Sequence, residues 1–354
     1  MDVLTLVLAI ASMIFSHELG HFLACKALNI EVEEFGFGLP PRILTMFTWK
    51  GTAYTLNWLP LGGFVRPLGE SDPSIPNGLG AAVPWKRFSV YFAGPLMNLL
   101  MAMVLYAASF SHTGLPAVDQ VSIQALAPHS PAEQAGIQVG DLLVSMAAQP
   151  VTGMESVHAI VAPHKGEEIE VVVQRAGRQY TYNVLVRANP PAGEGSLGIV
   201  MSNPLRQVNI IQALPYGASA VVGQAYLLVT LPVQISQGLV SPEEARLVGY
   251  KGMYDMYKAV QEVEATPQAT PSGLNTLSFF AMISASLGIL NLIPIPAVDG
   301  GRILFLLPEV IFRRRIPQNV EMTINSISLL LLMALLVYIN VQDFINPATF
   351  NLVP

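Results

Sequence analysis

The sequence has little charge and almost no cysteine. Of its 354 residues only 12% are charged and 52% are hydrophobic, whereas soluble domains are about 25% charged. This composition excludes an ordinary soluble globular protein and predicts an integral membrane protein with a soluble part. The single cysteine, Cys25, excludes an internal disulfide framework. A net charge of -6 without a basic stripe or tail argues against nucleic acid as a partner.

Four apolar stretches are long enough and poor enough in charge to cross a membrane as helices. They are residues 3–28, 88–112, 276–298 and 323–342. The first follows Met1 and Asp2, so no Lys or Arg precedes it, and no small-residue cleavage site closes it. We therefore expect this stretch to be retained as a span and not removed as a signal peptide.

A fifth stretch, 213–238, is apolar but contains two prolines and several polar residues. The Lys and Arg residues between 50 and 87 and at 313–315 place both of those loops on the cytoplasmic side, by the positive-inside rule. Both termini then lie outside, which four spans satisfy and five do not. We therefore predict an interfacial or partly inserted helix at 213–238, followed by an amphipathic segment over 241–262 on the outer surface.

Two segments between the spans have β-structure patterns. The loop 30–87 is rich in Gly and Pro, and its stretch GTAYTLNWLPLGGFVRP alternates like a β-hairpin that dips into the membrane. Residues 117–203 form the soluble part, where SPAEQAGIQVGDLLVSM predicts a short helix, a stop at Gly136 and a strand. EEIEVVVQRAGRQYTYNVLV predicts two strands joined at Ala176 and Gly177. This part resembles a PDZ domain of the circularly permuted bacterial kind, for which SPAxxAGxxxGD is a signature.

The stretch SHELGHFLAC places two histidines and a glutamate inside the first span. Such groups are costly in lipid unless something compensates them. His17 and His21 are four residues apart and so share one face of a helix, where two neutral imidazoles can bind one zinc ion. Glu18 beside them can act as general base toward the attacking water. The alternative is a chance HExxH match, which is improbable inside an apolar span because unpaired His and Glu are costly there.

A catalytic zinc site needs a third protein ligand and an open position. The motif NLIPIPAVDGGRI, residues 291–303, has an acidic residue, Asp299, at the end of the third predicted span. The first and third spans descend in the same direction, so Asp299 reaches the depth of His17 and His21. We therefore predict Asp299 as the third ligand. The alternative is that Asp299 only caps the helix that opens at Gly300.

These motifs together resemble those of a bacterial site-2 protease. HELGH in the first span, AGPLMN at 93–98 in the second, one PDZ-like domain and NLIPIPAVDGG in the third follow the order of the regulator-of-sigma-E type. That type is an intramembrane zinc metalloprotease of peptidase family M50. The resemblance covers essentially the whole chain. It implies one zinc ion per chain, bound by His17, His21 and Asp299, with Glu18 as the catalytic base.

The resemblance also implies residues that bind substrate. Asn291 would hold substrate backbone near the metal, and a membrane-reentrant β-loop at 52–68 would pair with an unwound substrate segment. Asn98 has two interpretations, a substrate contact and a helix-packing amide. The other substrate-binding positions are Thr55, Asn57, Gly62 and Gly63 in the β-loop, with Leu197, Gly198 and Ile199 in the peptide groove of the PDZ-like domain.

Composition, motifs and resemblance predict a polytopic α-helical membrane protein with about four transmembrane helices, a membrane-associated β-hairpin loop and one inserted PDZ domain. The expected segments are a first span with HELGH (1–29), a cytoplasmic reentrant loop region (30–87), a second span (88–112), an extracytoplasmic PDZ domain (113–203), interfacial helices (204–275), a third span (276–301), a cytoplasmic loop (302–322), a fourth span (323–345) and a tail (346–354).

The expected function is hydrolysis of peptide bonds within or near transmembrane segments of single-span proteins, in the bacterial cytoplasmic membrane with its lipid. The resemblance implies pre-trimmed anti-sigma factors or remnant signal peptides as substrates, and a PDZ domain that binds substrate or a C-terminal peptide. Two other functions stay open, a non-catalytic adaptor with structural zinc and a metal transporter. Glu18, which zinc binding does not require, argues against the adaptor. The absence of paired repeats argues against the transporter. Cys25 is expected to pack and not to bind metal.

Overall fold

The computed structural model describes residues 2–70, 72–241, 245–265 and 275–347. The chain divides into two compact units. The helical unit comprises Met1–Phe110 and Ile210–Pro354, and the β unit comprises Ser111–Asn209. Most of the predicted tail at 346–354 lies outside the described residues, as do 242–244 and 266–274 within the predicted interfacial region.

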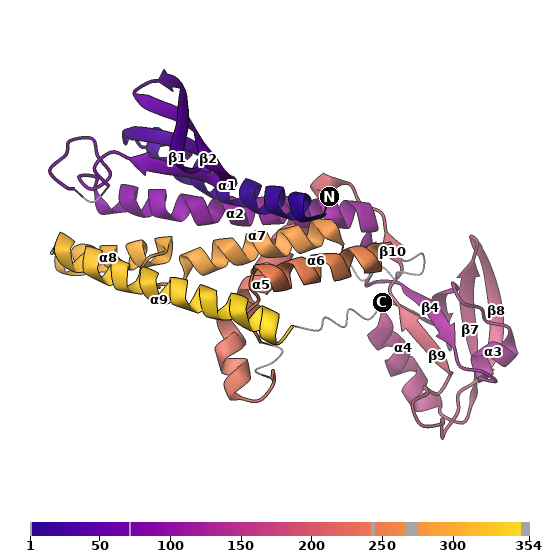
Figure 1. Cartoon of the computed structure of the whole chain (residues 1–354). Helices are drawn as coiled ribbons and strands as arrows, with labels where there is room; N and C mark the ends of the chain where they lie inside the picture. Colours follow the sequence, from indigo (N-terminus) through magenta and orange to yellow (C-terminus); the bar gives the residue numbers. More distant parts are fainter. Residues whose placement is uncertain (1, 71, 242–244, 266–274, 348–354) are drawn as a thin grey trace. The chain divides into compact units, whose positions relative to one another are not determined.

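The helical unit is built from long helices packed closely side by side (Figure 1). They are α1 (Asp2–Ala27), α2 (Pro84–Thr113), α5 (Ile210–Ser236), α6 (Tyr250–Glu264), α7 (Thr276–Leu292), α8 (Asp299–Phe312) and α9 (Gln318–Ile345). Glycine lets the backbones approach: a Cβ atom on Gly20 of α1 would lie 2.3 Å from the carbonyl oxygen of Ala93 in α2. Small residues at such contacts are typical of helices that pack in membranes.

Four of these helices are long and apolar enough to cross a membrane, namely α1 from Val3 onward, α2, α5 and α9. The number agrees with the prediction, but the set differs, because α5 qualifies and α7 is a shorter apolar helix of 17 residues. The helix α7 ends at Leu292, six residues before the predicted end, because Pro294 and Pro296 cannot continue it. Asp299, which the sequence predicts near the end of the third span, begins a separate helix, α8, and this helix continues to Phe312 through the first half of the predicted loop 302–322.

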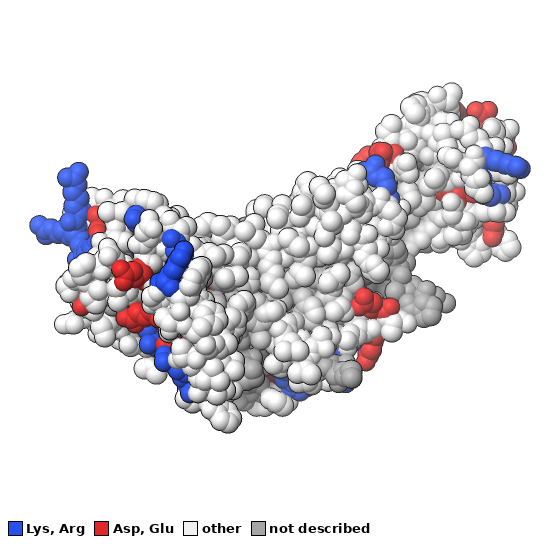
Figure 2. Space-filling model, turned by 90° about the horizontal axis from the view of Figure 1, so that it is seen from above, with Lys and Arg blue, Asp and Glu red and all other residues white. Residues whose placement is uncertain are grey.

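Charge is distributed over the helical unit as expected for a chain in lipid. The face in Figure 2 has a broad band without charged side chains, between charged groups at the ends of the unit. Large apolar side chains on α5 and α9 are exposed, among them Val222, Val229, Leu330 and Leu331. Such a surface suits hydrocarbon and not water.

The β-loop differs from the predicted hairpin. The stretch 52–68 does not pair with itself; it forms one strand, β2 (Thr52–Pro67), that pairs antiparallel with β1 (Val32–Trp49). Both strands fold back, so that Phe35 pairs with Tyr54 on one side and with Val65 on the other. The alternation of apolar and polar residues predicts a strand but does not identify the strand with which it pairs. The sequence therefore could not show this arrangement.

The pairing of β1 and β2 creates a small sheet of four segments. Their spatial order is 42–49, 52–57, 32–37 and 63–67. Within the described residues, segment 63–67 pairs on one side only, with β1. This edge segment carries Val65, whose N–H donates to Glu18 Oε2 at 3.1 Å. Within the described residues no other strand lies along this edge, so a further strand can pair with it.

The β unit contains a six-stranded antiparallel sheet with the order β8-β7-β5-β4-β9, and β6 pairs with β5. Its elements are β3 (Leu115–Pro116), β4 (Val121–Leu126), α3 (Pro131–Ala135), β5 (Leu142–Met146), β6 (Gln149–Pro150), α4 (Met154–Val161), η1 (Ala162–His164), β7 (Glu168–Arg175), β8 (Arg178–Leu185), β9 (Ile199–Ser202) and β10 (Leu205–Arg206). Ser130 caps α3, and Gly136 ends it with a left-handed φ of 94°. The helix α4 is an element that the sequence did not predict.

A buried ion pair stabilises the β unit. Asp141 is fully buried, and its carboxylate accepts hydrogen bonds from Arg175 Nε and Nη2, both at 2.7 Å, and from the N–H of Gln138 at 2.9 Å. Burial by itself would raise the pKa of Asp141, but these donors hold that pKa below its ordinary value. The carboxylate therefore binds a proton less readily in the folded state than in the unfolded state.

We expect the contribution of Asp141 to stability to be complete above about pH 4 and to be lost as the pH falls toward its lowered folded pKa. In the full chain, the protection of amides in β5 and β7 against hydrogen exchange, measured relative to the intrinsic exchange rate at each pH, should fall over this acidic range. The variant Asp141→Asn should exchange faster already at pH 7 and respond less to acid. An unchanged acid response in Asp141→Asn would show that other groups control the stability of this unit.

Candidate active site

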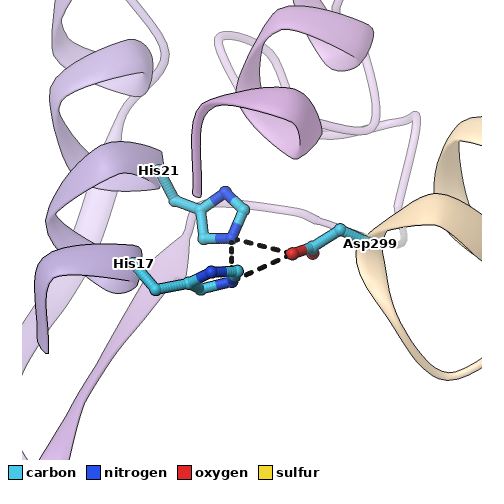
Figure 3. Close-up of side chains that lie close together, drawn as sticks. All are labelled: His17, His21 and Asp299. Atoms are coloured by element: carbon cyan, nitrogen blue, oxygen red, sulfur yellow. Dashed lines mark hydrogen bonds and ion pairs between the residues drawn. The ribbon is translucent and has the colours of Figure 1, made fainter. Parts of the chain in front are cut away.

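Two successive turns of α1 present His17 and His21 toward Asp299, the first residue of α8 (Figure 3). The two Nε2 atoms lie 3.1 Å apart. Asp299 Oδ2 lies 3.0 Å from Nε2 of His17 and 3.3 Å from Nε2 of His21. All three side chains are buried. In the described part of the chain, this is the single group of three or more His, Cys, Asp or Glu side chains whose possible ligand atoms all lie within 4.8 Å of one another.

The hydrogen bonds behind the histidines determine which nitrogen faces the centre. His21 Nδ1 lies 2.7 Å from the carbonyl oxygen of Val90, which can only accept, so Nδ1 carries the proton. The unprotonated Nε2 of His21 then faces Asp299. Lone pairs that converge in a buried space repel one another unless a cation lies between them. Two imidazoles and one carboxylate are a ligand set of catalytic zinc sites.

Asn98 of α2 supports the same tautomer for His17. Its Nδ2 atom lies 3.5 Å from His17 Nδ1, and its Oδ1 atom is buried without a hydrogen-bond partner. The two ends of an amide are assigned from such networks. Turning this amide by 180° gives Oδ1 a donor, the N–H at His17 Nδ1, and leaves Nε2 of His17 free to bind a metal. The residues present therefore fit a zinc ion.

Gly94 of α2 forms the wall behind the histidines. A Cβ atom at this position would lie 2.3 Å from His21 Nε2 and 2.8 Å from His17 Nε2. Any side chain there would collide with both ligand atoms. The sequence identified the surrounding AGPLMN motif, but it did not reveal this contact, which joins residues of two different helices.

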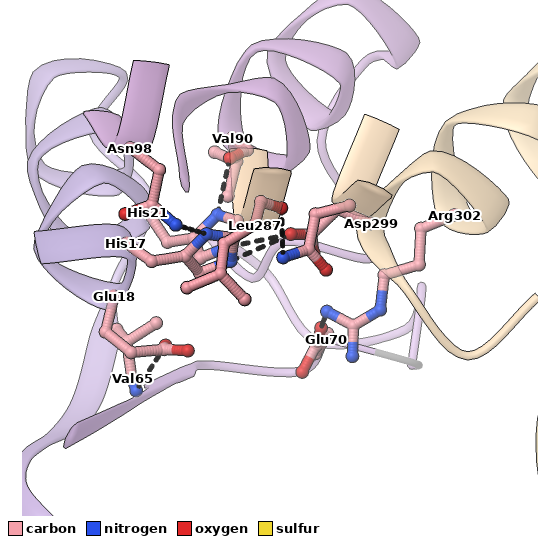
Figure 4. Close-up of polar contacts among 11 residues, drawn as sticks. His17, Glu18, His21, Val65, Glu70, Val90, Asn98, Leu287, Asp299 and Arg302 are labelled. Carbon is pink, nitrogen blue, oxygen red and sulfur yellow. Dashed lines mark hydrogen bonds and ion pairs between the residues drawn. The ribbon is translucent and has the colours of Figure 1, made fainter. Parts of the chain in front are cut away.

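A cavity of about 190 Å³ opens beside the three ligands and is lined by Glu18, Val65 and Asn291, among others. Glu18 is half-buried, and its Oε2 accepts a hydrogen bond of 3.1 Å from the N–H of Val65 in the edge segment (Figure 4). Asn291 Nδ2 donates to the carbonyl oxygen of Leu287 at 2.9 Å. The predicted base, the predicted backbone-binding amide and the three ligands thus face one space.

The lining of this cavity also includes three polar side chains that the sequence did not identify, Arg302, Glu70 and Tyr91. Arg302 lies three residues after Asp299 on α8 and forms an ion pair with Glu70 (Figure 4). Its guanidinium carbon lies 5.6 Å from the ring centroid of Tyr91. The i, i+3 spacing from Asp299 could have indicated Arg302, because such residues share a helix face. Glu70 and Tyr91 come from separate segments and carry no such signal.

The other predicted substrate-binding residues do not line this cavity. Thr55 is buried and donates to Glu34 Oε1 at 2.8 Å, and Asn57 donates to the carbonyl oxygen of Phe37 at 3.3 Å. The glycines of the β-loop permit close approach, since a Cβ atom on Gly62 (φ 76°) would lie 2.4 Å from Ile14 of α1, and one on Gly63 would lie 2.7 Å from the carbonyl oxygen of Gly36. These four residues therefore shape the small sheet that carries Val65.

Asn98 also lies outside the cavity lining, behind His17, where it is almost completely buried. The predicted peptide groove belongs to the β unit. Leu197 is buried in the core of that unit, Gly198 adopts a left-handed φ of 71°, and Ile199 begins β9. Cys25 is buried among apolar side chains, and among the residues that the structure describes it belongs to no metal-ligating group.

Fold and site together define a class, a multi-pass membrane protein with a buried His–His–Asp metal site and an adjacent glutamate. The family model "Peptidase family M50" matches residues 5–335. The chain therefore belongs to peptidase family M50, which confirms the resemblance of its motifs.

Individual relatives agree with this assignment. A protein of Clostridium acetobutylicum is 30% identical over 99% of both chains. One of Clostridium perfringens is 30% identical over 98% of this chain and 99% of its own, and one of Campylobacter jejuni is 31% identical over 97% and 93%. All three carry the name "Putative zinc metalloprotease". A solved HtrA-type protease with a decapeptide matches 23% of this chain and 25% of its own at 22% identity and a TM-score of 0.20.

Proposed function

We propose that this protein is a zinc endopeptidase of the site-2 type that cleaves single-span membrane proteins within or near their transmembrane segments. One observation carries the proposal. Within a helix apolar enough to cross a membrane, His17 and His21 converge with Asp299, and Glu18 lines the same cavity. Ionisable groups at such depth are a mark of function. The relatives named as zinc metalloproteases support zinc as the metal.

Several of the groups that line the cavity have separate roles in peptide-bond hydrolysis. When bound, zinc would supply Lewis-acid polarisation of a carbonyl and a lowered pKa for water. Glu18 takes the proton of the attacking water and passes it to the leaving amine. The N–H of Val65 holds the Glu18 carboxylate toward the cavity. Asn291, on the opposite helix, can hold the substrate backbone through its amide oxygen.

The packing supports a four-span topology that uses α7 and not α5. The end of α2 and the start of α7 lie on the same side, because Asn275, the N-cap of α7, donates to Ser109 Oγ at 2.8 Å. The chain between them must therefore cross the membrane an even number of times. Of its described helices only α5 is long and apolar enough, so α5 lies partly inserted. With the positive-inside rule, both termini and the β unit are extracytoplasmic in a bacterial cytoplasmic membrane.

The edge segment 63–67 is suited to hold an unwound substrate. A transmembrane helix hides its peptide bonds in internal hydrogen bonds, so it must open before it can be cleaved. An extended segment can then add to the free edge of the sheet through backbone hydrogen bonds. Val65 places this edge at the cavity, because its N–H reaches Glu18.

We expect Val65→Pro to lower substrate cleavage about fivefold or more, since proline removes the N–H that holds Glu18 and faces the cavity, and one hydrogen bond contributes about 1 kcal/mol. The matched control Val65→Ala keeps the N–H and should retain activity within about twofold. Initial rates on a single-span reporter, with zinc content measured in parallel, test this. Equal rates for the proline and alanine variants would exclude strand addition at Val65.

The β unit is proposed to be a PDZ-like domain that binds substrate or a freshly exposed C-terminus. Its strand β9 pairs with β4 on one side only within the described residues, and the tight turn at Gly198 leads directly into it. An edge strand after such a turn can accept a peptide. Deletion of Ser111–Asn209 should then allow substrates with a bulky outer domain to be cut. Unchanged selectivity after this deletion would argue against a selective role.

The proposed function is tested by reconstituting the protein in liposomes with a single-span reporter whose outer domain has been removed. We expect cleavage within the transmembrane segment, located by mass spectrometry of both products. Pre-trimmed anti-sigma factors and remnant signal peptides are the first reporters to compare. Cleavage confined to soluble regions of every reporter would contradict intramembrane proteolysis. Bound zinc without cleavage of any reporter would favour the adaptor.

A further inference from the structure

The last turn of α1 borders a second cavity, away from the metal ligands. It has a volume of about 630 Å³ and is lined by Phe22, Leu23, Lys26, Asn29, Ile30, Glu31, Trp49, Lys50 and Asn77. A neighbouring cavity of about 280 Å³ shares Asn29, Ile30 and Asn77 and adds Lys86. Because the apolar stretch of α1 ends at Ala27, these cavities lie at the level where a span leaves the hydrocarbon.

Three lysines surround this space, and no ion pair with an acidic residue is found for any of them within the described residues. Lys26 Nζ donates to Thr52 Oγ1 at 2.6 Å, and Lys86 Nζ donates to the carbonyl oxygen of Leu28 at 3.0 Å. Lys50 is exposed, with Nζ 4.8 Å from the ring centroid of Trp49. Glu31 is the single acidic residue in the lining of the two cavities. The space therefore has an excess of positive charge.

The floor of the larger cavity is apolar. Phe22 is buried beneath Lys26, whose Nζ lies 5.6 Å from the centroid of the Phe22 ring. Leu23 and Trp49 are exposed to 48% and 58%, which is costly in water but suits a lipid chain. Trp at this level is typical of the membrane interface. Cations above an apolar floor match a phosphate attached to an acyl chain.

We propose that these two adjoining cavities together bind an anionic phospholipid, with its phosphate near Lys26 and Lys50 of the larger cavity and Lys86 of the smaller one, and an acyl chain along Phe22, Leu23 and Trp49. Basic pockets beside transmembrane helices on the cytoplasmic side are suited to such headgroups. The site is separate from the His–His–Asp centre, so it requires no catalytic activity. Its occupant would rest against both α1 and the turn that joins β1 to β2.

The experiment measures lipid binding to the full-length protein in detergent after delipidation, by native mass spectrometry. Phosphatidylglycerol and phosphatidylcholine with identical chains, and inorganic phosphate, are the three probes. We expect phosphatidylglycerol to bind at least about tenfold more tightly than phosphatidylcholine. The double variant Lys26→Gln, Lys50→Gln should lose most of that preference, since it removes two of the three cations that would face the phosphate.

A matched control is Lys251→Gln, Lys258→Gln in α6, which changes the net charge equally at a site away from the cavity. It should keep the preference. Lys50→Glu provides a second test, because Lys50 is an exposed turn residue whose reversal leaves the packing intact; it should weaken phosphatidylglycerol alone. Equal binding of both lipids, full competition by inorganic phosphate, or an equal loss in the α6 control would each overturn the proposal.

Discussion

Glu18→Gln is expected to lower the rate of peptide-bond cleavage by about 10²–10⁴-fold, the usual contribution of a general base, and to leave zinc bound. The amide has the size of the carboxylate and can still accept the hydrogen bond from the N–H of Val65. It cannot take a proton from water. Glu18 is not among the three convergent ligands, so its loss should not release the metal.

The measurement compares initial rates of the wild type and the variant on the same single-span reporter, with zinc content determined on both preparations. Asp299→Asn provides the contrast, because it weakens a ligand and should lose zinc and activity together. If Glu18→Gln cleaved at the wild-type rate, Glu18 would not be the base. If it lost zinc, Glu18 would belong to the metal site and not beside it.

Gly94→Ala is expected to weaken zinc binding by about 10–100-fold, the range seen when the surroundings of metal ligands are altered. The new Cβ atom would lie 2.3 Å from His21 Nε2, which is the atom that must bind the metal. His21 cannot simply move away, because its Nδ1 atom is bonded to the carbonyl oxygen of Val90 at 2.7 Å. His21 must then either break its hydrogen bond to Val90 or move its Nε2 atom away from the metal-binding position.

Gly223→Ala is the matched control for this variant. It is also a helical glycine, and a Cβ atom there meets nothing within 4 Å. In a helix this exchange ordinarily stabilises by about 0.5–1 kcal/mol. Competition with a chelator of known affinity should distinguish the two variants, while thermal unfolding checks that both are folded. Retention of zinc by Gly94→Ala at wild-type affinity would show that Gly94 does not shape the site.

Much of the candidate site could be predicted because two of its three proposed ligands, His17 and His21, lie close together in the sequence. The spacing of His17 and His21 places both on one helix face wherever that helix lies. The strand pair of the β unit was equally local, since Ala176 and Gly177 both adopt left-handed φ, at 48° and 81°, in the turn that joins β7 to β8. Asp299 required an additional argument from topology, because 278 residues separate it from His21.

Other features could not be read from the sequence because they depend on contacts between distant segments. Gly94 faces the histidines only because α1 and α2 pack with almost no space between them. The position of Val65 at a free sheet edge follows from the way β1 and β2 fold back together. The composition of α5 permits a full span, whereas the contact between Ser109 and Asn275 argues against one.

The sequence by itself determined that the chain enters a membrane, that one apolar helix carries two histidines at metal-ligand spacing with a glutamate beside them, and that a β-rich unit is inserted between helices. Periodicity, turn chemistry and composition depend on residues that are close in the sequence, so they can be interpreted without knowledge of the fold. Tertiary structure alone decided how Asp299, Asn98, Gly94 and Val65 surround those ligands. Each of these positions results from close packing of segments far apart in the chain, and no local pattern encodes such packing.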